Sequence, residues 1–110
     1  MKAYCRCAYI LCLGILLHGC SQAPEKVVHN RYTVEIKGMK FNPAELMVQT
    51  GDTVVWINHD LVLHNITDET NHAWASPPIP DGQSWTMLVK GSADYYCSLH
   101  VVMKGKLIVQ

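Results

Sequence analysis

The sequence predicts an all-β fold, an antiparallel sandwich or barrel in one small domain. From Tyr32 onward, short runs of alternating apolar and polar residues are separated by Gly, Pro, Asn and Asp, which is typical of strands joined by turns. No stretch of this region has the period of an amphipathic helix. The length of the region suits a single domain with a small core.

The strands are expected in the following order. The alternation of Tyr32, Val34 and Ile36 predicts the first strand, and residues 45–49 predict the second. A turn at 50–52 leads into a third strand at 53–58, which is expected to be central. Further strands are expected at 84–89, 95–97 and 106–109.

Residues 67–82 interrupt this pattern. They contain Pro77, Pro78 and Pro80, and proline has no N–H to donate to a neighbouring strand. This stretch is therefore predicted to be irregular and not a central strand.

The first nineteen residues are predicted to be an export signal and not part of the fold. Lys2 and Arg6 give the positive start of such a signal. The apolar stretch at 8–17 has the length of a secretory signal and is too short to span a membrane. The protein is therefore expected to be exported.

Residues 17–20 resemble a bacterial lipobox, in which Cys20 would be lipid-modified and become the first residue of the mature protein. His18 stands where a small residue is usual, so ordinary cleavage nearby, or an uncleaved anchor, stays open. An Asp directly after the lipidated Cys would retain a lipoprotein in the inner membrane, but Ser21 stands there. In a bacterium with two membranes, we therefore expect the protein on the periplasmic face of the outer membrane. The expected organisation is a lipoprotein-type signal at 1–19, lipidated Cys20 and a polar tether at 20–31, and the domain at 32–110.

The charge of the chain excludes one class of function. The sequence has nine Lys and Arg against nine Asp and Glu. Without Lys2 and Arg6, seven basic residues remain against nine acidic ones, a formal charge of −2 for the mature form. Nucleic-acid binding calls for clustered basic residues, which this chain lacks.

Four residues have the chemistry of a mononuclear blue-copper site. Cys97, His100 and Met103 stand at intervals of three, and His64 lies upstream. Two imidazoles and a thiolate give copper a trigonal plane, and a thioether supplies the weak axial ligand of an electron-transfer centre. Each of these residues alone would be read as core packing, but the joint pattern favours one copper ion.

The cysteine count supports this interpretation. Of the five cysteines, Cys97 is the only one in the predicted domain, because the others lie in the first twenty residues. A binuclear copper site would need a second thiolate there. A structural zinc site closes with four strong ligands, and methionine is a poor one for zinc.

The chain resembles the cupredoxin family, and most of all its amicyanin-type and plastocyanin-like members. The resemblance rests on the motifs at residues 39–41, 51–58, 64–65, 94–97 and 105–106, and on the short Cys-x2-His-x2-Met loop. It implies a cupredoxin-like Greek-key β-sandwich of seven or eight strands. It also implies one-electron transfer between Cu(I) and Cu(II).

The resemblance implies roles for residues around the ligands. Asn65 would tie the two ligand loops together. His100 would serve as the electron port, through an apolar surface built from Met39, Leu99, Val101 and Val102. Leu99 replaces a proline of amicyanin-type loops, so we expect its N–H to donate to the Cys97 sulfur. The interval from His64 to Cys97 is shorter than in amicyanins, so their redox partner is not carried over.

The expected function is therefore a periplasmic electron-transfer protein with transient redox partners, monomeric and not an enzyme. A copper carrier or storage module is the alternative, and His-rich or Met-rich tracts outside the site would favour it. A copper enzyme would need a second metal site and a substrate pocket.

Overall fold

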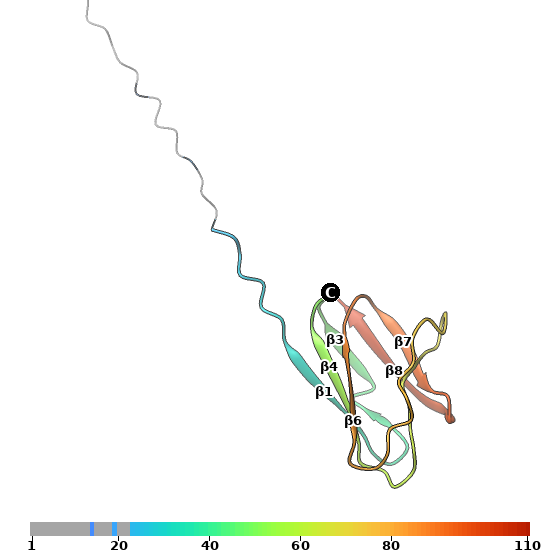
Figure 1. Cartoon of the computed structure of the whole chain (residues 1–110). Coiled ribbons are helices and arrows are strands. Elements are labelled where there is room, and N and C mark those ends of the chain that lie inside the picture. The colour runs from blue at the N-terminus through green and yellow to red at the C-terminus, as the bar shows by residue number, and fades with distance from the viewer. Residues whose placement is uncertain (1–13, 15–18, 20–22) are drawn as a thin grey trace, which may run out of the picture.

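The structure is a computed structural model that describes residues 14, 19 and 23–110. Cys20 and nearly all of the predicted signal therefore lie outside the described residues. The described chain forms eight strands (Figure 1): β1 (Arg31–Ile36), β2 (Phe41–Asn42), β3 (Glu45–Val48), β4 (Thr53–Asn58), β5 (Thr67–Asp68), β6 (Ser84–Leu88), β7 (Ala93–Cys97) and β8 (His100–Val109). Within this part of the chain, no helix is long and apolar enough to cross a membrane.

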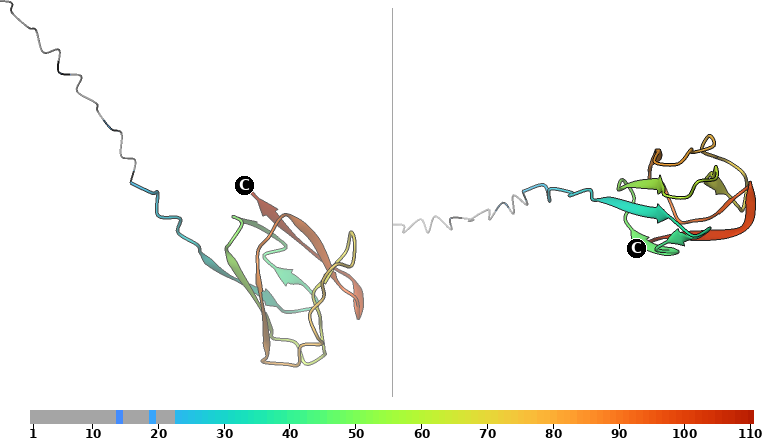
Figure 2. Two further views of the ribbon diagram at one scale, coloured as in Figure 1. Left: turned by 45° about the horizontal axis from the view of Figure 1, so that its top comes forward. Right: turned by 90° about the horizontal axis from the view of Figure 1, so that it is seen from below.

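The strands form two four-stranded sheets. One has the order β2-β1-β4-β6 and the other β3-β8-β7-β5, with parallel pairs at β1–β4 and β3–β8. Figure 2 shows the arrangement of the strands from two further directions. The predicted all-β sandwich is confirmed, and β4 lies inside its sheet as expected for the third predicted strand.

The core is built from the inward faces of both sheets. Trp56 on β4 and Tyr95 on β7 are its largest fully buried side chains, and their rings meet edge to face at 5.5 Å between centroids. Gly105 on β8 pairs with Tyr95 across the hairpin, where a Cβ atom would come within 2.1 Å of Tyr95 Cζ. Only glycine therefore leaves room for this buried ring.

The strand bounds differ most from the sequence prediction at three strands, β8, β2 and β5, and β7 also begins at Ala93, two residues before its predicted start. β8 begins at His100, six residues before the predicted start, because the loop after β7 is short enough to form a hairpin. β2 and β5 were not predicted, since each has only two residues and no alternation to detect. Outside β5, residues 69–82 contain only isolated bridges, as the prolines predict.

The fold brings two segments to one end of the sandwich. The chain leaves β4 at Asn58, and the β7–β8 hairpin turns at Ser98 and Leu99. Both lie toward the lower end in Figure 1, opposite the C-terminus. The predicted metal ligands lie on these two segments.

Candidate metal centre

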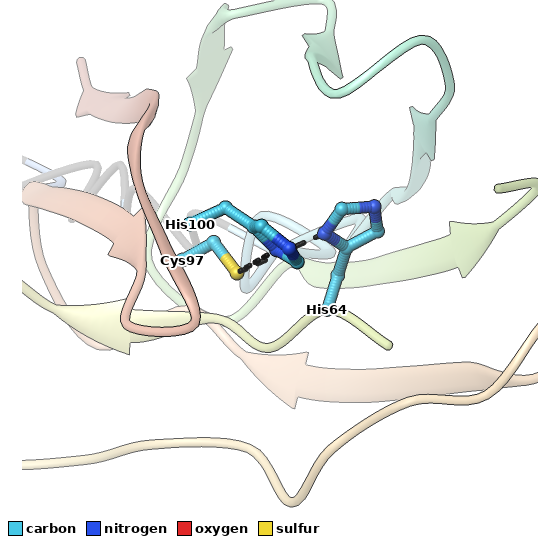
Figure 3. A group of neighbouring side chains, drawn as sticks. All are labelled: His64, Cys97 and His100. Atoms are coloured by element: carbon cyan, nitrogen blue, oxygen red, sulfur yellow. Dashed lines mark hydrogen bonds between the residues drawn. The ribbon is translucent and has the colours of Figure 1, made fainter. Parts of the chain in front are cut away.

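Three of the predicted ligands converge at this end. Cys97 Sγ lies 3.8 Å from His64 Nδ1 and 3.7 Å from His100 Nδ1, and the three atoms lie within 4.8 Å of one another. Figure 3 shows both imidazoles turned toward the sulfur. Cys97 and His64 are fully buried, whereas His100 is half-buried. The arrangement leaves one place for an ion that all three atoms can bind.

Met103 lies in the core near these residues. It is 2% exposed and belongs to the same buried cluster as Cys97. It stands on β8 three residues after His100, as the spacing in the sequence requires. Its thioether provides the soft, weak donor that a blue-copper site uses as its axial ligand.

His64 is held in place by its backbone and by one nitrogen of its ring. Its backbone pairs with Ile79, which donates to the His64 carbonyl at 2.7 Å. Its Nε2 lies 2.8 Å from a carboxylate oxygen of Asp60. A hydrogen bond there fixes the proton on Nε2 and leaves Nδ1 free to bind a metal.

Asp60 was not predicted, and it organises the segment before His64. Its carboxylate accepts the backbone N–H groups of Gly38 at 2.7 Å and Met39 at 2.9 Å, besides its contact with His64. Burial raises the pKa of Asp60, but the N–H donors and His64 outweigh this effect, so its pKa lies below the usual value. The group is an anion that joins a ligand to the β1–β2 turn.

Asn65 joins the two ligand segments through three hydrogen bonds. Its backbone N–H donates to Cys97 Sγ at 3.4 Å. Its side-chain amide donates to Ser98 Oγ at 2.6 Å and accepts the Ser98 N–H at 2.7 Å. Among the described residues, the backbone N–H that donates to the sulfur is that of Asn65, and the hydrogen bond expected from the Leu99 N–H is not observed.

The residues expected to form an apolar surface around His100 are accessible to solvent. Met39, Leu99, Val101 and Val102 are all exposed, by 38% to 83%. Leu61, Val62 and Leu63 add to the exposed apolar residues at this end and were not predicted. The signal was present in the sequence as three consecutive apolar residues between a loop Asp and the ligand His64.

The other histidines of the described residues, His29, His59 and His72, are all exposed. Among the described residues, only His64, Cys97 and His100 form a cluster that could hold a metal ion. The donor set of two imidazoles, one thiol and a nearby thioether fits copper.

Comparisons with known proteins agree with this geometry. The model of the copper-binding proteins of the plastocyanin/azurin family matches residues 28–110. The chain is 33% identical over 94 residues to an amicyanin of Paracoccus denitrificans, covering 80% of this chain and 72% of the relative. It is 27% identical over 101 residues to amicyanin-alpha of Methylorubrum extorquens, covering 86% and 85%.

Solved structures show the same likeness. The Cu(I) form of an amicyanin mutant has a TM-score of 0.69 at 32% identity, covering 77% of this chain and 87% of that one. A copper nitrite reductase of Thermus scotoductus has a TM-score of 0.67 at 24% identity, but only 22% of it is covered, so that likeness concerns the fold alone. The chain belongs to the plastocyanin/azurin family of copper-binding proteins.

Proposed function

We propose that this protein passes single electrons between transient protein partners in the periplasm. It is an amicyanin-like blue copper electron carrier with a copper site formed by His64, Cys97, His100 and Met103, and not an enzyme. The observation that carries this function is the convergence of two Nδ1 atoms on a buried thiol sulfur within 4.8 Å. A copper ion bound there supplies the Cu(I)/Cu(II) couple.

The surrounding residues suit rapid electron transfer. Asp60 and Asn65 hold His64 and Cys97 by hydrogen bonds that do not involve the metal. Such contacts orient ligands before the metal binds and resist their movement when the metal changes charge. We propose this orienting role for both residues.

The electron port is the half-buried edge of His100. We define the copper-end apolar surface as Met39, Leu61, Val62, Leu63, Leu99, Val101 and Val102, all of them exposed. Contiguous exposed apolar residues favour protein docking. A small apolar contact suits a redox encounter that must form and separate quickly.

Replacing port residues by lysine tests this surface. Leu99→Lys or Val102→Lys should leave the blue spectrum intact while slowing electron transfer with the physiological partner, because a charge must be desolvated on docking. Leu88→Lys is the matched control, since Leu88 is 55% exposed at the far end of β6. Equal partner rates in all three variants would place the port elsewhere.

We further propose that a lipid on Cys20 anchors the protein to the outer membrane. The lipobox-like residues 17–20 and the polar segment that follows support this proposal. Two or more acyl chains give stable anchoring. Cys20→Ala should release the protein into the soluble periplasmic fraction, and undiminished membrane binding would indicate an uncleaved hydrophobic anchor.

Copper titration tests the assignment of the site. The protein should bind one Cu(II) with an intense blue absorption that reduction bleaches and reoxidation restores. Cys97→Ala should abolish the colour, because Cys97 is the only cysteine of the predicted domain. A blue Cys97→Ala protein would refute the assignment.

A chelator distinguishes the carrier or storage alternative. A copper store must release its ion, whereas an electron carrier must retain it through both redox states. The reduced protein should therefore keep its copper during many turnovers in the presence of a Cu(I) chelator. Transfer of the ion to the chelator at each reduction would favour storage.

A further inference from the structure

All three tryptophans of the sequence lie in one stack of aromatic rings. The ring centroids of Trp74 and Trp85 are 6.1 Å apart with the planes 23° from parallel. Those of Trp85 and Trp56 are 5.5 Å apart, and Trp56 meets Tyr95 at 5.5 Å. The stack is therefore continuous from the loop after β5, through β6 and β4, to β7.

The two ends of the stack have different surroundings. Trp74 and Trp85 are half-buried and line a surface hollow of about 250 Å³ together with Met87. A small molecule in solution can therefore reach the outer rings. At the inner end, Tyr95 and Cys97 are both fully buried and belong to the same core cluster.

We propose that this stack conducts oxidising equivalents from Trp74 to the copper centre and so protects the protein against one-electron oxidants in solution. The inference rests on the proposed copper site but concerns a second activity. The physiological port at His100 lies outside the stack. Trp74 would be oxidised first, and Trp85 and then Trp56 would be oxidised in turn as the charge moves toward the copper.

The chemistry of the rings favours tryptophan as the carrier. Among neutral side chains, indole loses an electron most readily without first giving up a proton. Rings that lie nearly in contact exchange an electron much faster than an oxidised indole reacts with water or oxygen. Phenylalanine in the same place would pack equally well but would not carry a charge.

Tyr95 lies between Trp56 and Cys97 but is not itself oxidised. A phenol is oxidised readily only when its proton can leave. Tyr95 is fully buried, and among the described residues its hydroxyl has no hydrogen-bond partner that could accept this proton. The oxidising equivalent therefore passes Tyr95 toward Cys97 without stopping on the phenol.

The electrons balance between the radical oxidant and the physiological electron donor. A radical oxidant takes one electron from Trp74 and becomes its reduced anion. Trp74 regains an electron through Trp85 and Trp56 from the reduced centre. Trp74 ends unchanged, the centre ends as Cu(II), and the physiological electron donor restores Cu(I).

The test compares the two redox states of the copper-loaded chain. Both forms are exposed to photochemically generated carbonate radical, and oxidation of Trp74 is measured by peptide mass spectrometry. Met47 is the internal standard, because it is 53% exposed on β3 and outside the stack. Relative to Met47, Trp74 should be oxidised less in the Cu(I) form than in the Cu(II) form. Equal Trp74 oxidation in the two forms would overturn the proposal. This comparison uses only the unchanged sequence.

Two variants locate the route. Trp85→Phe keeps the ring packing but breaks the chain, so the protection of Trp74 by Cu(I) should be lost. Tyr32→Phe is the matched control, since Tyr32 is an aromatic residue on β1 that packs against the core; it should keep the protection. Protection that survives Trp85→Phe would contradict the stack.

A second aromatic route must be separated from the stack. Tyr96, next to Cys97, contacts His72 at 3.1 Å between the hydroxyl and Nε2. If Tyr96→Phe abolishes the protection and Trp85→Phe does not, the equivalents travel through Tyr96 and the proposal is wrong. The blue spectrum of every variant is recorded first, so that failure of the copper site is recognised independently.

Discussion

The two histidine ligands come from regions with opposite character. His64 is fully buried, pairs with Ile79 through its backbone, and contacts Asp60 through its second ring nitrogen. His100 is half-buried at the start of β8, next to exposed apolar residues. One region holds the site in shape and the other gives access to it.

The two regions are held in shape in different ways. The segment before His64 satisfies its polar groups internally, with Asn58 Nδ2 donating to the carbonyls of Val62 and Ile79. Such a network fixes a loop that has no sheet ladder of its own. The hairpin at His100 has that ladder, so it can leave its outer side chains free for a partner.

Of the changes to the two regions, removing the Asp60 carboxylate should have the largest effect, and it should act on copper affinity through His64. Asp60→Ala leaves the buried His64 Nε2 without its partner, and loss of such an outer contact lowers metal affinity by about 10–100-fold. Copper affinity is measured by competition with a chelator. Asp60→Asn keeps the shape and an acceptor oxygen, so it should recover part of the affinity. An Asp60→Ala protein with unchanged affinity would show that His64 is positioned by its backbone alone.

Breaking the connection between the two regions should have the next largest effect. Asn65→Ala removes both side-chain hydrogen bonds to Ser98, each worth about 0.5–1.5 kcal/mol. The Asn65 N–H to the sulfur remains, so the site should stay blue while the unfolding free energy falls. Chemical denaturation of the copper-free protein measures the change.

Ser98→Ala is the matched and smaller perturbation. It removes only the hydroxyl that Asn65 Nδ2 contacts and leaves the Ser98 N–H bonded to Asn65 Oδ1. The expected loss is about 0.5–1.5 kcal/mol, the value of one hydrogen bond. A loss as large as that of Asn65→Ala would mean that the hydroxyl contact alone joins the two regions.

The opposite end of β4 provides a comparison without metal. Asp52 also accepts two backbone N–H groups, from Asn30 and Gln49, each at 2.8 Å. These hydrogen bonds, first that from Asn30 and then that from Gln49, lower the pKa of Asp52 below its model-compound value of 3.8. Its contribution to stability is therefore complete above pH 3.8 and is lost as the pH falls through the lower folded pKa.

The acid limb of the stability curve tests this contribution. In the copper-free protein, Asp52→Asn should be less stable than the unchanged chain at neutral pH, and the difference should shrink as the pH falls below 3.8. Thermal unfolding across that range measures it. A difference that is independent of pH would show that packing at the turn, and not the carboxylate charge, stabilises it.

Much of the site could be predicted because its ligands have unusual chemistry. Cys97, His100 and Met103 form a regular short motif, and the main strands alternate clearly. Asp60 could not be recognised, because an acid four residues before a histidine in an irregular loop resembles any surface acid. Its role exists only once Gly38 and Met39 of the β1–β2 turn are brought beside it.

The tryptophan stack could not be predicted for a related reason. Trp56 lies in the core and Trp85 packs against it. Their continuity with Trp74 depends on the path of the irregular loop after β5 and on the register of β4 with β6, where Trp56 pairs with Trp85. Neither is readable from apolar periodicity.

Voltammetry of the copper-loaded protein, with the visible spectrum recorded at each potential, tests the central claim most directly. If His64, Cys97, His100 and Met103 hold copper through both states, the protein should give one reversible one-electron wave. The blue colour should appear and disappear at the same midpoint over repeated cycles. An irreversible wave, or loss of copper from the reduced protein, would contradict an electron carrier built on this site.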